Sequence, residues 1–376
     1  MSDLALDPQP PALNTAQRLP DAASPRGSMR WSAGNIAWTA LAVWALFAPF
    51  FIKASVLSIG LFVMAAAVGA IGLSLLTGST GLLSLGHAFF IAVGAYGYAV
   101  LAGPPGAKVI GLGWPPLVAA IAAIGLAAIA GLLVSPIAAR LKGIYLGIAT
   151  FGLVFIGQHL LLNLTPLTGG FDGRSVTPFS LFGFEFSSAS SIHVLGVRFG
   201  SEELRWYLFL AVLAGAVLIA TRLLRGRTGR AWHMARDSEV AAASMSIDVQ
   251  SAKRTAFVTA SSFAGAAGVL TVLAFDRAVP AYYDLNLSIN FLVMITIGGL
   301  VSVRGAVLGA AFVVALPLLL VRYSDALPLV AEPGTPGLSA TVLSQFIYGI
   351  AVVVIVLINR DRLRAFVTRL TRTRAR

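Results

Sequence analysis

Long apolar runs, separated by short polar stretches, constrain the fold of this chain more than any other feature. Hydrophobic residues make up 57% of its 376 residues and charged residues only 11%, whereas a soluble domain carries about 25% charged residues. The runs have the length of helices that cross a bilayer, about 17–25 residues. Alternating segments of about ten residues, which build membrane β-barrels, are missing. We therefore predict an all-α, polytopic transmembrane helical bundle.

Ten runs qualify as candidate spans. They cover roughly residues 36–52, 54–76, 86–103, 115–138, 143–163, 206–223, 255–275, 288–302, 305–322 and 342–359. Only Lys53 separates the first two, so this hairpin is the weakest part of the prediction. We expect 36–52 to be a retained helix rather than a signal peptide, because Lys53 follows directly and no small-x-small cleavage site is visible.

The basic residues indicate the orientation of the bundle. With the N-terminus inside, twenty of the 27 Lys and Arg residues fall on cytoplasmic segments and seven fall outside, which is the positive-inside pattern. Both termini are therefore expected in the cytoplasm. The same topology accounts for the net charge of +12, so we expect no nucleic-acid partner.

The runs and the polar stretches between them predict five regions. These are a disordered cytoplasmic tail (1–34), a transmembrane domain (35–359) that contains a periplasmic loop (164–205) and a cytoplasmic loop (224–254), and a basic cytoplasmic tail (360–376). The periplasmic loop divides the ten helices into five and five. An odd number of helices per half would give the halves opposite orientations, as in transporters with inverted repeats. No residue-by-residue repeat is visible, so this interpretation rests on the helix count.

Composition excludes most enzyme chemistry. The chain has no cysteine and only four scattered histidines, so thiolate catalysis, Fe–S clusters and metal sites are not expected. No lysine follows a glycine, so there is no phosphate-binding P-loop, and no cofactor is expected. The predicted spans contain almost no charged residues, which argues against coupling to an ion gradient. The chain therefore needs an external energy source or is a passive channel.

A polar stretch from Thr228 to Phe257 interrupts the otherwise apolar chain. Its basic residues place it in the cytoplasm, and Ala231 to Met245 is rich in helix formers. A small apolar surface follows from Val240, Ala241, Ala243, Met245 and Ile247. Short helices of this kind can dock in a groove of a partner. The alternative, a helix lying on the membrane surface, is less favoured because alanine side chains bind lipid weakly.

Two glycine-rich segments are candidates for the solute pathway. In residues 77–98, glycines interrupt a predicted helix, and Ser84 and His87 would be polar groups on a discontinuous helix beside the pathway. Ordinary helix packing with a tight turn is the alternative. In residues 167–175, Asp172 could belong to the outer mouth of the pathway or contact a delivery protein. It could equally cap a helix within a turn.

A third glycine-rich segment, residues 297–310, predicts a tight cytoplasmic turn between two packed helices, with Arg304 at the level of the lipid headgroups.

Five blocks stand out in order along the chain: GLSLLTGSTGLLSLGHAFFIAVGAY (72–96), LKGIYLGIATFGLVFIGQ (141–158), LTGGFDG (167–173), GRAWHMARDSEVAAASMSIDV (229–249) and SINFLVMITIGGLVSVRGAVLGA (288–310). Together they resemble the permease subunits of bacterial ABC importers of the branched-chain amino acid family, in the LivM-like branch, which implies a location in a bacterial inner (plasma) membrane. The resemblance covers about residues 55–322. It implies import of branched-chain amino acids or a related small polar solute, such as urea, an amide or an aromatic acid.

The resemblance also implies partners. These are a second homologous permease subunit, two cytoplasmic ATPase subunits that hydrolyse ATP, and a periplasmic substrate-binding protein. It implies that the cytoplasmic loop couples to an ATPase through Arg230, Arg236, Glu239, Ala241, Ala242 and Ile247. From the residues alone, a self-contained passive channel or secondary transporter stays open. An intramembrane enzyme would need a nucleophile–base pair that the sequence lacks.

Three positions depart from the pattern of the family. Ser246 and Val301 stand where the family usually has glycine, and Ala306 stands where it usually has proline. We expect Ser246 to change the end of the coupling helix, and the other two to change the turn in residues 297–310. None of these departures removes a polar group, so we expect transport to be retained.

Overall fold

The structure is a computed structural model. It describes residues 33–106, 109–141, 143–181, 184–185, 192–194, 197–323, 339, 341–355 and 357. The predicted C-terminal tail and almost all of the predicted N-terminal tail lie outside the described residues. Residues 1–44 and 45–376 form separate compact units, and the contacts given below lie within the second.

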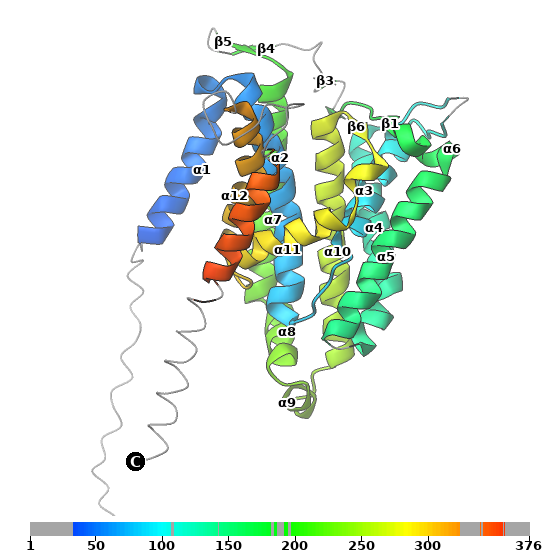
Figure 1. The fold of residues 1–376 in the computed structure, drawn as a ribbon, viewed down its shortest axis with the longest axis vertical. Helices are drawn as coiled ribbons and strands as arrows, with labels where there is room; N and C mark the ends of the chain where they lie inside the picture. Colours follow the sequence, from blue (N-terminus) through cyan, green and yellow to red (C-terminus); the bar gives the residue numbers. More distant parts are fainter. Residues whose placement is uncertain are drawn as a thin grey trace, which may run out of the picture. The chain divides into compact units, whose positions relative to one another are not determined.

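Helices make up most of the described chain (Figure 1). The α-helices are α1 (Ala33–Phe51), α2 (Ala54–Leu73), α3 (His87–Ala102), α4 (Pro116–Arg140), α5 (Ile144–Asn163), α6 (Thr165–Thr168), α7 (Ser201–Arg225), α8 (Arg227–Asp237), α9 (Glu239–Ser244), α10 (Val249–Phe275), α11 (Leu285–Gly298) and α12 (Val303–Arg322). A further apolar helix covers Thr341–Ile355. The π-helix η1 (Ser74–Gly78) extends α2, and η2 (Gly170–Asp172) and η3 (Pro280–Tyr282) are 3₁₀-helices.

The strands are short and pair only in antiparallel twos. β1 (Arg174–Ser175) pairs with β6 (Arg277–Ala278), β2 (Ser180–Leu181) with β3 (Phe184–Glu185), and β4 (Ile192–Val194) with β5 (Val197–Phe199). With so little sheet among the described residues, the predicted all-α class is confirmed.

The helices correspond to the ten predicted spans. Six described helices are long and apolar enough to cross a membrane: Ala54–Gly78, Pro116–Arg140, Ile144–Asn163, Ser201–Arg225, Val249–Phe275 and Val303–Arg322. Four shorter apolar helices match the other predicted spans: Trp38–Phe51, His87–Ala102, Leu285–Gly298 and Thr341–Ile355. The break at Lys53 is present, because its backbone is extended there (φ −64°, ψ 144°). The polytopic helical membrane bundle is thus confirmed.

Helices α10 and α7 begin five or six residues earlier than predicted. α10 starts at Val249 rather than 255, because the carboxylate of Asp248 accepts hydrogen bonds from the backbone N–H groups of Gln250 (3.0 Å) and Ser251 (3.1 Å). Such a cap satisfies the free N–H groups of a first turn. α7 similarly starts at Ser201 rather than 206. The prediction followed the apolar residues, whereas α10 continues beyond them to its capping residue Asp248, and α7 extends to Ser201 without a side-chain cap.

The two central helices are α2 and α10. They have the largest buried shares among the long apolar helices, 67% and 78% of their apolar stretches. α10 packs on α2, α3 and α4, and α2 packs on α7, α11 and α12. In addition, α3 packs on α4, and α11 on α12. The pairs α3–α4 and α11–α12 thus each pack together and on one central helix, α10 and α2 respectively.

Small residues let these helices approach closely. A methyl group added at Gly94 of α3 would lie 2.2 Å from the carbonyl oxygen of Gly265 in α10, and one at Gly268 would lie 2.0 Å from the carbonyl oxygen of Ile91. The backbones of α3 and α10 are therefore in direct contact, the usual device for packing helices in lipid. A methyl group at Gly305 of α12 would lie 1.8 Å from the carbonyl oxygen of Gly298. Helices α11 and α12, which flank the turn predicted in residues 297–310, are thus closely packed, as expected.

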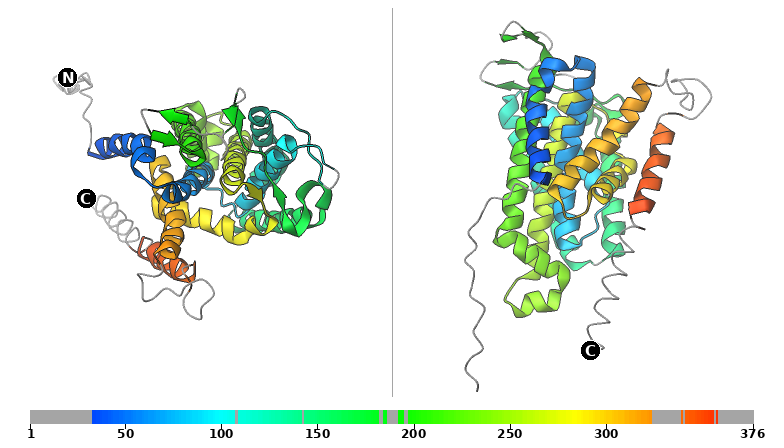
Figure 2. Two further views of the ribbon diagram at one scale, coloured as in Figure 1. Left: turned by 90° about the horizontal axis from the view of Figure 1, so that it is seen from above. Right: turned by 90° about the vertical axis from the view of Figure 1, so that its left-hand side faces the viewer.

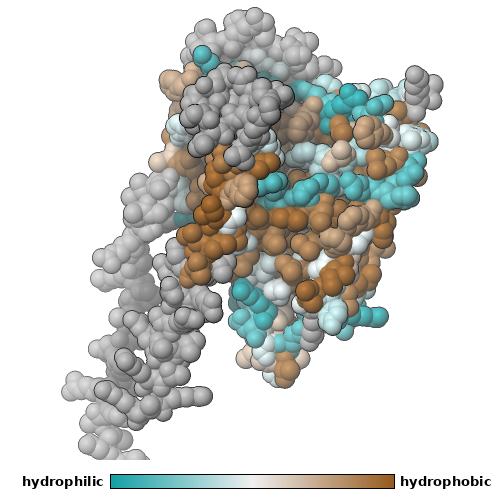
Figure 3. Space-filling view, in the orientation of Figure 1, coloured by the Kyte–Doolittle hydropathy of each residue, from teal (hydrophilic) through white to brown (hydrophobic). Residues whose placement is uncertain are grey.

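α11 runs across the bundle rather than along it. Seen from above, this helix is drawn lengthwise, whereas α10 is seen nearly end-on (Figure 2). Its 14 residues span about 21 Å at 1.5 Å per residue, less than the hydrocarbon thickness of about 30 Å. Figure 3 shows hydrophobic residues in a broad band below hydrophilic ones, with further hydrophilic residues at the lower end near α8 and α9.

Candidate functional site

Helices α8 and α9, here called the α8–α9 module, project at the lower end of the described helices (Figures 1 and 2). The module is held to α10 by two side-chain contacts. Trp232 is fully buried, and its Nε1 donates to Oγ1 of Thr255 at 3.2 Å. Lys253 is only 4% exposed, and its Nζ donates to Oε1 of Glu239 at 2.8 Å. The module is therefore a packed extension of the membrane helices rather than a loose loop.

Arg236 joins the same module to α2. Its Nη1 donates to the carbonyl oxygen of Gly78, at the end of the π-helix η1 that extends α2. A cation at a helix C-terminus is favourable because the last carbonyl groups lack helical partners and carry partial negative charge. The α8–α9 module thus bonds to both central helices, α2 and α10, which belong to different halves of the chain.

Helix α9 has a defined start and end. The Ser238 hydroxyl accepts a hydrogen bond from the N–H of Ala241 at 3.2 Å, which is an N-cap. At the other end, Ser246 adopts φ 61°, and the N–H groups of Ser246 and Ile247 donate to the carbonyls of Ala243 and Ala242 at 3.0 Å each. This pair of bonds is a Schellman motif, in which the left-handed position is usually glycine. Ser246 therefore stands at the C-terminal end of α9, where we expect it to change how the helix ends.

Val240 in α9 and Met245, the C-cap residue that follows it, are exposed apolar residues and are together called the exposed face of α9. Their side chains are 82% and 67% exposed, far more than a short helix needs if it only packs on its own protein. The six predicted coupling residues differ in their exposure. Arg230, Arg236 and Ala241 are exposed, Glu239 and Ile247 are half-buried, and Ala242 is fully buried. The burial of Ala242 gives it a packing position within the module.

A polar cavity of about 370 Å³ lies where the module meets the membrane helices. Thr80, Gly81 and Leu82 line one side, with Gly143 before α5, and Ala235 to Glu239 and Lys253 complete the lining. The structure therefore brings Arg236 and Glu239 together beside the residues that follow α2. Among the described residues, no group of three His, Cys, Asp or Glu side chains could hold a metal ion.

The predicted interruption between α2 and α3 is present. Gly81 has φ 71°, and residues 81–86 are non-helical. Helix α3 then starts at His87. Oγ1 of Thr150 accepts from the N–H of Leu85 at 2.9 Å, and Oγ of Ser288 accepts from the N–H of Ala88 at 3.0 Å. Side chains of α5 and α11 thus satisfy backbone groups of the broken segment, as non-helical backbone in a membrane bundle requires.

Ser84 and His87, the candidate pathway residues of this segment, are both buried at 2% exposure. The Ser84 hydroxyl accepts from the N–H of Gly86 at 3.3 Å, and Nε2 of His87 bonds the carbonyl oxygen of Gly69 in α2 at 3.0 Å. Both side chains therefore help to hold the interruption in place. A role for them in the pathway stays a prediction.

Asp172 ends η2, between α6 and β1, and these two elements lie at the opposite end of the bundle from the α8–α9 module (Figure 1). Its carbonyl oxygen accepts two hydrogen bonds from Arg277, from Nη2 at 2.7 Å and Nε at 3.1 Å. Here β1 pairs with β6, so the segment before α7 is tied to the segment between α10 and α11. Burial lowers the pKa of neighbouring Arg174, while Tyr96 acts to raise it.

This end of the bundle also carries an ion pair. Both terminal nitrogens of Arg205 bond the carboxylate of Asp276, at 2.8 and 2.9 Å, in the bidentate geometry that arginine favours. The sequence reasoning passed over this pair, as it did Trp232, Thr255 and Ser288. For Trp232 a signal was present, because a large apolar residue within a polar loop needs burial. For Ser288 there was none, since its partner is a backbone N–H 200 positions away.

Residues 55–357 match the family described as branched-chain amino acid transport system / permease component. The chain is 34% identical over 287 residues to the high-affinity branched-chain amino acid transport system permease protein LivM of Escherichia coli strain K12, covering 73% of this chain and 66% of that protein. It is also 34% identical over 289 residues to LivM of Salmonella typhimurium strain LT2, with the same coverage. The chain thus spans slightly less than two thirds of these relatives. No solved structure matches it significantly.

Proposed function

This chain belongs to the family of permease components of branched-chain amino acid transport systems, and from that premise we propose that it forms the membrane-spanning subunit of an ABC importer. The solute is a branched-chain amino acid or a related small polar compound, such as urea, an amide or an aromatic acid. The name of the LivM relatives, which specifies branched-chain amino acids, supports the first of these. The family match over residues 55–357 is the observation that carries the proposal.

The proposed importer contains further subunits. A second homologous permease completes the pathway, two cytoplasmic ATPase subunits hydrolyse ATP, and a periplasmic binding protein delivers the solute. The chain lies in the inner membrane with both termini in the cytoplasm, where the basic residues of the α8–α9 module also lie. In this arrangement the module faces the ATPase.

The exposed face of α9 is the proposed contact with the ATPase. Val240 and Met245 would enter an apolar groove, as short amphipathic helices do in other complexes, and neighbouring Ala241 would allow close approach. Arg230, Arg236, Glu239, Ala242 and Ile247 would then support the contact from within or beside the module.

Movement of the module would reach both halves of the bundle. Arg236 bonds Gly78 at the end of α2, while Glu239 bonds Lys253 and Trp232 bonds Thr255 in α10. A displacement of α9 would therefore act on both central helices. In the proposed mechanism, their movement opens the pathway alternately to the two sides of the membrane. ATP drives this change only through different affinities of the ATPase for the two conformations.

The proposed docking face is tested with the variant Val240→Asp/Met245→Asp, expressed together with the ATPase subunits. We expect co-purification of the ATPase to fall at least about tenfold, since two charges would have to be desolvated in an apolar groove. Thr228→Asp, at an exposed position of α8, is the matched control and should leave co-purification unchanged.

Uptake into proteoliposomes tests the function itself. With the ATPases, the second permease and the binding protein present, labelled leucine should accumulate only when ATP is supplied. Uptake by this chain alone would instead identify a passive channel or secondary transporter. Unchanged co-purification of the Val240→Asp/Met245→Asp variant would contradict the docking face while leaving the importer assignment standing.

A further inference from the structure

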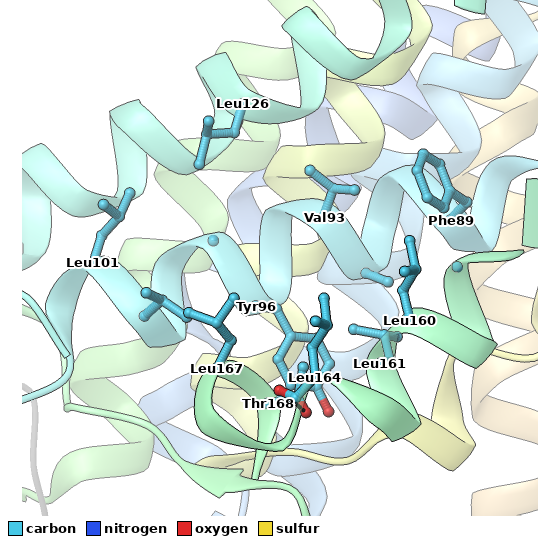
Figure 4. A pocket seen from close by; sticks show the side chains of 14 residues that line it. Phe89, Val93, Tyr96, Leu101, Leu126, Leu160, Leu161, Leu164, Leu167 and Thr168 are labelled. Carbon is cyan, nitrogen blue, oxygen red and sulfur yellow. Dashed lines mark hydrogen bonds between the residues drawn. The ribbon is translucent and has the colours of Figure 1, made fainter. Parts of the chain in front are cut away.

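An apolar cavity of about 350 Å³ lies between α3, α4, α5 and α6, away from the α8–α9 module (Figure 4). Its volume falls within the range of about 300–1,000 Å³ typical of ligand pockets. Apart from Tyr96 and Thr168, every lining residue has an apolar side chain or is glycine. We propose that this cavity binds one acyl chain of a membrane phospholipid, whose ester oxygen accepts a hydrogen bond from the Tyr96 hydroxyl.

The packing of α5 explains why the cavity exists. α4 packs mainly on α10 and α3, whereas α5 has only limited packing on α3, α6 and neighbouring short elements. Helices α4 and α5 are therefore not packed against each other beside α3, and a space remains between them. Leu126 of α4 and Leu160 of α5 line this space and are 43% and 44% exposed, so the cavity opens toward the apolar surface that these helices present. In a membrane, that surface meets lipid chains.

The Tyr96 hydroxyl indicates what the ligand must carry. Tyr96 is 5% exposed, and within the described part of the chain its hydroxyl is buried without a hydrogen-bond partner. Figure 4 shows Tyr96 reaching from α3 toward α6, at the end of the cavity where Thr168 lies. The Thr168 hydroxyl is already engaged, because it donates to the carbonyl of Leu164 and accepts from the N–H of Gly170. A buried phenol hydroxyl without a partner is unfavourable, so an acceptor that reaches it from the cavity would be stabilised.

The lining excludes the transported solute as the occupant. A free amino acid carries a carboxylate and an ammonium group, and both would lose their hydration in an apolar cavity that offers one free hydroxyl. An acyl chain has no such cost, and its ester carbonyl needs only one donor. The cavity thus belongs to the interaction of the protein with the bilayer, and it is separate from the proposed solute pathway.

Photolabelling tests this assignment. The assembled transporter is placed in nanodiscs of phosphatidylethanolamine and phosphatidylglycerol that contain a phosphatidylethanolamine with a diazirine in mid-chain, irradiated, and analysed by peptide mass spectrometry. We expect labels to concentrate on the cavity residues Val93, Val100 and Leu161 relative to Leu133, an exposed residue of α4. Val93→Trp, which fills the cavity, should abolish this enrichment, and Ile129→Trp, on the exposed face of α4, should preserve it.

A second variant removes one oxygen atom and keeps the packing. Tyr96→Phe should lower the amount of phospholipid retained after detergent washing about two- to tenfold, the effect of losing one hydrogen bond, as measured by native mass spectrometry. Equal labelling of cavity and surface would overturn the proposal. So would loss of cavity labelling on addition of saturating leucine, which would make the cavity a solute site. Absence of cavity labelling in the assembled transporter would show that a second permease subunit covers the opening.

Discussion

Ser246 holds a backbone conformation that side chains disfavour. At φ 61°, a residue with a Cβ is less stable than glycine by about 1–2 kcal/mol. We therefore predict that Ser246→Gly stabilises the end of α9 by about 1 kcal/mol. Slower hydrogen exchange of the α9 amides in the purified protein would show this.

The matched control for this variant is Ser244→Gly, two residues earlier and inside α9. The backbone there is helical and does not need a positive φ, so glycine offers no advantage. Its greater freedom in the unfolded chain should destabilise α9 by about 0.5–1 kcal/mol. If both variants changed exchange in the same direction, the left-handed position would not explain the effect.

The Glu239–Lys253 pair is unequal, because Lys253 is buried while 37% of the Glu239 side chain is exposed. Glu239→Ala would leave a buried ammonium group without its carboxylate, and we expect a loss of about 1–3 kcal/mol, between the values for surface and buried pairs. Lys253→Met keeps the packing of the stem and leaves a carboxylate that water can reach, so it should cost less than about 1 kcal/mol. Thermal unfolding of both variants in one detergent would contradict this if Lys253→Met were the less stable.

At the scale of elements, length and apolar composition were sufficient to locate the spans. The sequence also indicated the interruption after α2, because several glycines stand close together there. It did not indicate how the α8–α9 module is attached. The bond from Arg236 to Gly78 joins positions 158 residues apart, and it ends on a backbone carbonyl, which carries no sequence signal. Arg230 and Arg236 therefore looked equivalent, although only Arg236 is seen to reach α2.

This difference between the two arginines predicts different defects. Arg236→Ala removes the bond to α2 but leaves the exposed face of α9 intact, so the ATPase should still bind while ATP-driven uptake falls roughly tenfold, as for the loss of one charged hydrogen bond. Arg230 bonds only the nearby carbonyl of Arg225, at 3.4 Å, in the described structure, so Arg230→Ala should lower uptake much less than Arg236→Ala. Equal uptake by the two variants in proteoliposomes would show that the bond to α2 carries no coupling.

At the scale of the whole molecule, stability depends on direct backbone contact between α3 and α10. A methyl group at Gly268 would overlap the carbonyl oxygen of Ile91, so Gly268→Ala should separate the helices and cost more than about 2 kcal/mol, as overpacking of a core does. Gly125→Ala in α4 meets no atom within 4 Å and should be neutral or stabilising by about 0.5 kcal/mol. Thermal unfolding in detergent compares the two, and similar midpoints would contradict the packing argument.

The pairing of β1 with β6 has a mechanical consequence. These strands, together with the bonds from Arg277 to Asp172, fasten the two halves of the chain at the end of the bundle opposite to α9. Bodies fastened at one end swing about that end, so their displacement grows with distance from it. We therefore expect the end of the bundle that carries β1 and β6 to move least when α8 and α9 are displaced.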